Sequence, residues 1–198
     1  MSRSVVRWSG RISAAVVGVA LSGGLLGVLP SANAAPNGCV SVNGHQGPKY
    51  GTAECASSGR FSVAIANGND SEAVATGDFN RATANGEGAL AYAEDGSHNS
   101  ATAKGDYAGA YATSGNNNTA TAKGDRTTAF AGVGDNNTAT ATAYNSRAVS
   151  EVGSNNVVKA TARDSRAENV NGSNNRLTAR TPGCTVSNVG SDGQTLSC

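Results

Sequence analysis

Aromatic residues, histidines and charges are all scarce in this 198-residue sequence. It contains three Phe, one Trp, five Tyr and two His, and 15% of its residues are charged. His45 and His98 are isolated in sequence, Ser is plentiful but forms no nucleophile-elbow motif, and the carboxylates are scattered. We therefore expect no enzyme activity and no cofactor. Gly, Ala, Asn and Thr dominate instead, which is typical either of a disordered chain or of tightly wound β-structure.

A long hydrophobic run occurs only at the start of the sequence. Arg3, Arg7 and Arg11 precede an uncharged stretch over residues 12–29, and Ala32-Asn33-Ala34 follows it. This order predicts a signal peptide over residues 1–34. The alternative is an uncleaved membrane anchor, because 18 uncharged residues approach the length that spans a bilayer. The signal predicts a secreted, extracellular or cell-envelope protein that makes no membrane contact after cleavage.

The sequence also lacks an excess of either charge. It has 15 Lys and Arg and 14 Asp and Glu, and three of the basic residues are the arginines of the signal. The remaining 12 basic residues against 14 acidic ones give a net charge of −2. This balance gives no reason to expect nucleic acid or an anionic membrane surface as a partner.

The sequence does have a strict repeat of nineteen residues, in which blocks of nine and ten residues alternate from Asn80 onward. Six asparagines open the nine-residue blocks at this spacing, namely Asn80, Asn99, Asn118, Asn137, Asn156 and Asn175. Five glycines recur at the same spacing, namely Gly96, Gly115, Gly134, Gly153 and Gly172. Such a period is the signature of a repeat architecture.

Each block predicts one short β-strand followed by a turn. The third and fifth positions are small or apolar, as in Ala82 and Ala84 or Ala91 and Ala93, and the residues between them vary. Alternation of period two indicates a half-buried strand, and a Gly, Asn and Asp cluster after it indicates a turn. Because the same residue types recur at the same phase, successive coils should stack in register. The predicted fold is all-β, a two-sided parallel β-solenoid with 19-residue coils over residues 61–183.

The two repeated turn residues have structural interpretations. The Asn column should form a ladder in which each side-chain amide donates to the amide of the next coil. The alternative is that Asn merely tolerates the backbone angles of a turn. The Gly column is best explained by turn positions with positive φ.

Four cysteines flank the repeats, and none lies within them. They are Cys39, Cys55, Cys184 and Cys198. An exported chain with an even number of cysteines normally forms disulfides. Three pairings are open, and we favour Cys39 with Cys55 and Cys184 with Cys198, each stapling a cap, over residues 35–60 and 184–198. Metal binding is the weaker interpretation, because no C-x-x-C spacing occurs.

The outward-facing columns of the coils carry the candidate partner surface. The fourth position of the ten-residue blocks gives Tyr92, Tyr111, Phe130 and Val149, ending at Glu168. A stripe of this kind is either an intramolecular ladder of stacked rings or a docking and self-association surface.

The nine-residue blocks carry a threonine column that gives the alternative function. The column is Thr83, Thr102, Thr121 and Thr140, followed by Lys159 and Thr178. It resembles the threonine arrays of ice-binding solenoids, although Thr is also a good strand residue. Gly-Asp turns resemble calcium-binding β-rolls, but Glu87, Tyr144 and Arg163 stand where Asp should recur. A β-roll that binds calcium or an ice surface is therefore the alternative function.

One segment resembles a known family. The stretch NSATAKGDYAGAYATSGNNNTATAKG, residues 99–124, is similar to the head repeats of trimeric autotransporter adhesins, and the similarity covers roughly residues 61–180. The signal and composition also resemble those of small exported actinobacterial proteins. The resemblance implies an adhesin-like structural and interaction protein with a protein or cell-surface partner. The aromatic column, independently of the resemblance, suggests homo-oligomers formed through the aromatic face.

Overall fold

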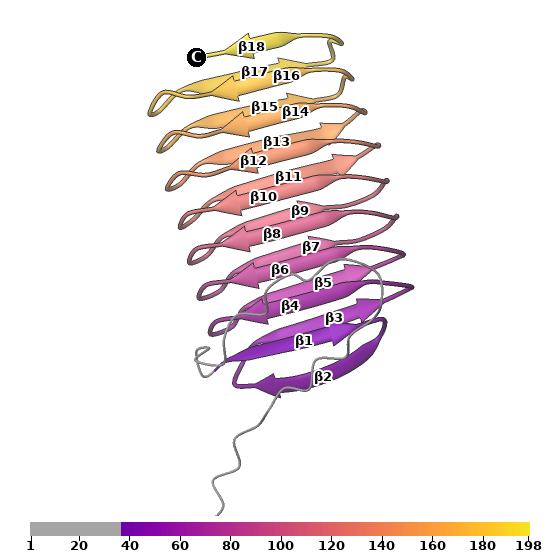
Figure 1. Ribbon diagram of the computed structural model, residues 1–198. Helices are drawn as coiled ribbons and strands as arrows, with labels where there is room; N and C mark the ends of the chain where they lie inside the picture. The colour runs from indigo at the N-terminus through magenta and orange to yellow at the C-terminus, as the bar shows by residue number, and fades with distance from the viewer. Residues whose placement is uncertain (1–36) are drawn as a thin grey trace, which may run out of the picture. The chain divides into compact units, whose positions relative to one another are not determined.

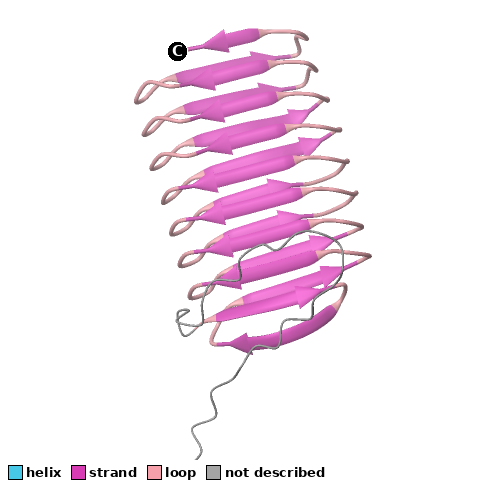
Figure 2. Ribbon diagram, in the orientation of Figure 1, coloured by secondary structure: helices cyan, strands magenta, loops and turns pink. Residues whose placement is uncertain are grey.

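A computed structural model describes residues 37–198, which form two β-sheets wound from one continuous solenoid (Figure 1). Between residues 37 and 198 every regular element is a strand (Figure 2). No helix in that range could cross a membrane. The signal peptide predicted over residues 1–34 lies outside the described residues.

The chain passes alternately through a ten-stranded and an eight-stranded sheet. The ten-stranded sheet has the order β18 (Thr195–Ser197), β16 (Arg176–Ala179), β14 (Val157–Ala160), β12 (Thr138–Ala141), β10 (Thr119–Lys123), β8 (Ser100–Lys104), β6 (Arg81–Asn85), β4 (Val63–Asn67), β1 (Gly38–Val42) and β2 (His45–Tyr50). The eight-stranded sheet has the order β17 (Thr185–Val189), β15 (Arg166–Val170), β13 (Arg147–Val152), β11 (Thr128–Val133), β9 (Gly109–Ala112), β7 (Leu90–Ala93), β5 (Glu72–Thr76) and β3 (Glu54–Ser58).

Neighbouring coils stack in register, as the repeat predicts. Ala120 pairs with Ala101 on one side and with Ala139 on the other, each nineteen residues away. The strands are parallel from β4 to β18 in one sheet and from β3 to β17 in the other. The predicted fold class, an all-β parallel β-solenoid with coils of nineteen residues, is confirmed.

The apolar part of the interior consists mostly of alanine methyl groups. In β10, Ala120 and Ala122 are fully buried, while Thr119 and Thr121, which precede them, are half-exposed. This alternation follows from the pleat of a strand, which sends successive side chains to opposite faces. Larger apolar side chains replace Ala only toward the C-terminus, as at Leu177.

The glycine column occupies left-handed turn positions, as predicted. The φ angles are 153° at Gly96, 149° at Gly115, 121° at Gly134, 120° at Gly153 and 129° at Gly172. Each of these glycines lies three residues before an asparagine of the Asn column. The turn that leads from the eight-stranded to the ten-stranded sheet is therefore built the same way in these five coils.

The Asn column is buried and ties each coil to the next. The Asn99 backbone N–H donates to Asn80 Oδ1 at 2.7 Å, and this contact repeats along the column to Asn175 and Gln194. Each Nδ2 donates to a turn carbonyl of the following coil, from Asn80 to the Gly96 oxygen at 2.9 Å onward.

The amide-to-amide contact expected from the sequence occurs at only one step of this ladder. Asn156 Nδ2 donates to Asn137 Oδ1 at 3.1 Å. At the other steps the ladder runs from amide to backbone. The reason is that the side chain points inward at the corner of the coil, where the nearest polar groups are backbone groups of the next turn.

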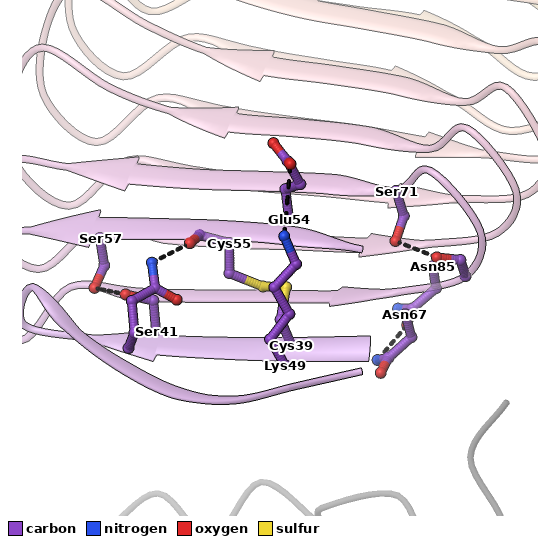
Figure 3. The surroundings of a disulfide bond; sticks show 11 residues. Cys39, Ser41, Lys49, Glu54, Cys55, Ser57, Asn67, Ser71 and Asn85 are labelled. Carbon is purple, nitrogen blue, oxygen red and sulfur yellow. Dashed lines mark hydrogen bonds and ion pairs between the residues drawn. A yellow bond between two sulfur atoms is a disulfide. The ribbon is translucent and has the colours of Figure 1, made fainter. Parts of the chain in front are cut away.

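The N-terminal end differs from the rest, because two antiparallel strands cover the first coil. β1 pairs antiparallel with β4 and also with β2. Cys39 in β1 is disulfide-bonded to Cys55 in β3, and the Ser41 and Ser57 hydroxyls lie 2.8 Å apart beside them (Figure 3). Because β3 already pairs parallel with β5, the solenoid begins within residues 35–60, before residue 61 where the repeat pattern placed its start.

The C-terminal end continues the stack. Residues 184–198, predicted as a cap, contribute β17 and β18, which pair in register with β15 and β16. Cys184 is bonded to Cys198. Both disulfides have the favoured pairing, and such bonds are typical of oxidising compartments.

Removing the C-terminal disulfide should destabilise the fold measurably. The bond joins residues with a sequence separation of 14. A cross-link of this span lowers the conformational entropy of the unfolded chain, which stabilises the fold by about 3 kcal/mol. We expect the double substitution Cys184→Ser and Cys198→Ser to lower the free energy of unfolding in urea by about this amount. An unchanged unfolding midpoint would show that the bond does not constrain the chain.

Candidate contact surface on the eight-stranded sheet

Three successive strands of the eight-stranded sheet each present one aromatic ring outward. Tyr92 in β7 pairs in register with Tyr111 in β9, which pairs with Phe130 in β11. The alanines on either side of each ring are fully buried, so the rings point away from the core and are half-exposed. We call Tyr92, Tyr111 and Phe130 the aromatic stripe.

The rings of the aromatic stripe contact one another along the stack. The centroids of Tyr92 and Tyr111 lie 5.5 Å apart with an interplanar angle of 5°. Those of Tyr111 and Phe130 lie 6.4 Å apart with an angle of 45°. Both separations fall within the range in which aromatic pairs attract. Because the second angle is much larger than the first, the parallel stacking of rings ends at Tyr111.

Two glycines explain why Phe130 turns away from the stack. A Cβ atom at Gly109 would lie 2.9 Å from the ring of Tyr111, and one at Gly132 would lie 2.3 Å from the ring of Phe130. Each ring therefore covers the nearby glycine of its own strand. Gly109 precedes Tyr111 by two residues and Gly132 follows Phe130 by two, so the rings lean toward opposite ends of their strands.

The change of direction leaves a shallow hollow with a volume of ≈ 460 Å³. The lining residues are Tyr111, Thr128, Phe130, Arg147, Val149 and Glu151. We refer to it as the Phe130 hollow. It was not expected from the sequence, although the glycines at outward positions 109 and 132 are a signal that could have revealed it.

Val149 does not contribute to an accessible partner surface, contrary to the sequence expectation. It lies in register with Phe130 but is only 1% exposed. Phe130 and Arg147, which have larger side chains, lie beside Val149 and shield it from solvent. Val149 therefore lines only the floor of the hollow. Glu168 ends the column, where it pairs with Arg147 at 3.0 Å and Arg166 at 2.6 Å.

Burial and a nearby carboxylate shift the pKa of both tyrosines in the aromatic stripe. Burial, and after it the carboxylate of Glu72, raise the pKa of Tyr92 well above its ordinary value. The same two causes raise the pKa of Tyr111. Both hydroxyls are protonated at neutral pH, as an ordinary tyrosine is, and can donate hydrogen bonds.

A second aromatic stack, which the sequence analysis did not identify, lies on the turns. Phe61 stacks on Phe79 with centroids 5.0 Å apart, and Phe79 stacks on His98 at 4.8 Å. All three residues have positive φ, between 56° and 60°, which is rare for bulky side chains. Phe79 and His98 directly precede Asn80 and Asn99, and later coils carry Asn at this position.

The threonine columns lie on the outward face of the ten-stranded sheet. Thr102, Thr121 and Thr140 pair in register, and Ser100, Thr119 and Thr138 form a second hydroxyl column beside them. Lys159 interrupts the first column in the next coil. Within residues 37–198 no group of three His, Cys, Asp or Glu side chains is arranged to hold a metal ion.

Comparisons with protein-family models, curated proteins and solved structures gave no match for this chain.

Proposed function

We propose that the protein is an exported structural and interaction protein of the adhesin type, without catalysis. The solenoid acts as a rigid spacer, and the aromatic stripe is its contact surface for a protein or cell-surface partner or for a second copy of the chain. The observation that carries this proposal is the column of half-exposed rings at Tyr92, Tyr111 and Phe130 on a regular sheet. Aromatic residues of this kind are enriched where proteins bind one another.

Three further features support an interaction role outside the cell. The signal-like segment over residues 1–34 and the two disulfides are both typical of exported chains. The resemblance of residues 99–124 to adhesin head repeats agrees with a β-solenoid that presents a surface. In-register coils also keep outward side chains at fixed spacing, so binding loses little side-chain freedom.

Replacing Tyr92, Tyr111 and Phe130 together by Thr tests the proposal. Thr keeps strand propensity but removes the apolar rings. We expect self-association or binding to cell-surface preparations to fall at least about tenfold, because aromatic anchors dominate contact energies. The fold should persist. Sedimentation velocity and thermal melting, measured on the same samples, give the two quantities.

A matched control removes the turn stack instead. Phe61, Phe79 and His98 are all replaced by Asn, the residue that later coils carry at the same left-handed position. This variant should sediment and bind as the original chain does. If the stripe variant shows unchanged sedimentation and surface binding but a lower melting temperature, the rings form only an intramolecular ladder and the contact surface lies elsewhere.

The alternative proposal is a ligand-binding β-roll for calcium or an ice surface. The observation in favour of ice is the pair of in-register hydroxyl columns on β8, β10 and β12. Thermal hysteresis that disappears in Thr121→Lys would support an ice-binding face. A melting temperature that rises with calcium and falls with chelator would support a metal site.

A further inference from the structure

We propose that the Phe130 hollow binds one neutral sugar unit of a surface polysaccharide. This inference rests on the proposed function, because it names the chemistry of the partner that the contact surface would meet. It is carried by the shape of the hollow, by its polar groups and by the balance of their charges.

The hollow offers an apolar, aromatic wall. Tyr92 stacks on one face of the Tyr111 ring, so the opposite face borders the hollow. The Phe130 ring is tilted by 45° to the Tyr111 ring and leans over Gly132. Thr128 and the buried Val149 complete the lining on this side. Such a wall suits the C–H face of a sugar ring, and ≈ 460 Å³ lies within the usual size range of ligand clefts.

Two charged side chains supply a hydrogen-bond donor and an acceptor. Arg147 Nε donates to Glu168 Oε1 at 3.0 Å, which orients the guanidinium group. The two Nη groups of Arg147 and the carboxylate of Glu151 have no side-chain partner among residues 37–198. They are free to bind a ligand in the hollow, where both residues contribute to the lining.

The charges of these groups select a neutral ligand. The hollow is lined by one carboxylate, that of Glu151, and by one guanidinium group, that of Arg147, so an anion and a cation would each meet a like charge there. A hydroxyl group both donates and accepts hydrogen bonds. Neighbouring sugar hydroxyls can therefore accept from Arg147 and donate to Glu151 without adding charge.

A printed array of neutral, acidic and basic oligosaccharides, probed with the fluorescently labelled full chain in its oxidised form, tests the proposal. We expect retention on neutral oligosaccharides. Arg147→Gln and Glu151→Gln should each weaken it about tenfold, because each removes a hydrogen bond to a charged group. Arg166→Gln is the matched control. Arg166 is also an arginine paired with Glu168, but it lies in the next coil and does not line the hollow. Its replacement should therefore leave binding unchanged.

Several outcomes would overturn the inference. These are no retention on any neutral oligosaccharide, retention on acidic ones alone, or an equal loss in Arg166→Gln and Arg147→Gln. Thermal melting of each variant identifies losses caused by unfolding. If no sugar binds but the stripe variant still loses association, the sugar inference fails while the contact surface stands. If sugar binding depends on Arg147 but the stripe variant leaves association unchanged, the sugar inference stands and the proposed contact surface for self-association fails.

Discussion

Replacing Gly134 by Ala, one of the five recurring turn glycines, should strongly destabilise the solenoid. Gly134 has φ +121°, and an added Cβ would lie 2.2 Å from the carbonyl oxygen of Gly153 and 2.8 Å from its carbon. Both atoms belong to the backbone of the next coil, so neither can move away without separating the coils. We expect the free energy of unfolding in urea to fall by more than about 3 kcal/mol, the sum of left-handed strain and overpacking.

Gly183→Ala is the control that separates these two causes. Gly183 also has positive φ, at +70°, but an added Cβ would meet no atom within 4 Å. Only the backbone conformation should cost energy there, about 1 kcal/mol. Equal losses in the two variants would mean that the close approach of neighbouring coils does not require glycine.

Replacing Asn118 by Ala should have the second largest effect, because it breaks the ladder between coils. Asn118 is fully buried. Its Oδ1 accepts the backbone N–H of Asn137 at 2.9 Å, and its Nδ2 donates to the Gly134 carbonyl at 2.8 Å. Removing the amide leaves a buried donor and a buried acceptor without partners, at about 1–3 kcal/mol each. We expect a total loss of about 3 kcal/mol in the same urea experiment.

Its neighbour Asn117 provides the matched control. Asn117 is exposed and has φ 59°, a conformation that glycine also adopts easily. Asn117→Gly should therefore change the free energy of unfolding by no more than about 0.5 kcal/mol. If Asn118→Ala is no more costly than Asn117→Gly, the Asn column does not hold the coils together.

The repeating part of the fold could be predicted from the sequence because every coil meets the same environment. A residue such as Ala120 has Ala on both neighbouring coils, so the strand, its buried face and its register all follow from one period. The disulfides followed from the position of the cysteines outside the repeats, with Cys39 and Cys55 on one side and Cys184 and Cys198 on the other.

The N-terminal strands could not be predicted in this way. β1 and β2 have no counterpart in the repeat, and their antiparallel pairing depends on how the chain folds back over the first coil. The start of the solenoid at β3 was missed for the same reason. The sequence of β3 lacks the repeated Asn and Gly positions that mark the later coils.

The nineteen-residue period alone could not predict the details of the candidate site either. Whether Val149 is exposed depends on the size of side chains in neighbouring coils, and the lean of each ring depends on where a glycine leaves room. The Asn column illustrates a similar limit. A recurring Asn is compatible with amide-to-amide or amide-to-backbone contacts, and only its inward orientation at the corner decides between them.

Ring-to-ring nuclear Overhauser effects test most directly the central claim that outward residues nineteen apart form one stripe. We expect cross-peaks between Tyr92 and Tyr111 and between Tyr111 and Phe130, whose ring centroids lie 5.5 and 6.4 Å apart. Single substitutions to Thr assign the signals. No cross-peak should join Tyr92 to Phe130, because they are two coils apart. A folded chain without the Tyr92–Tyr111 cross-peak would contradict the register, the stripe and the hollow together.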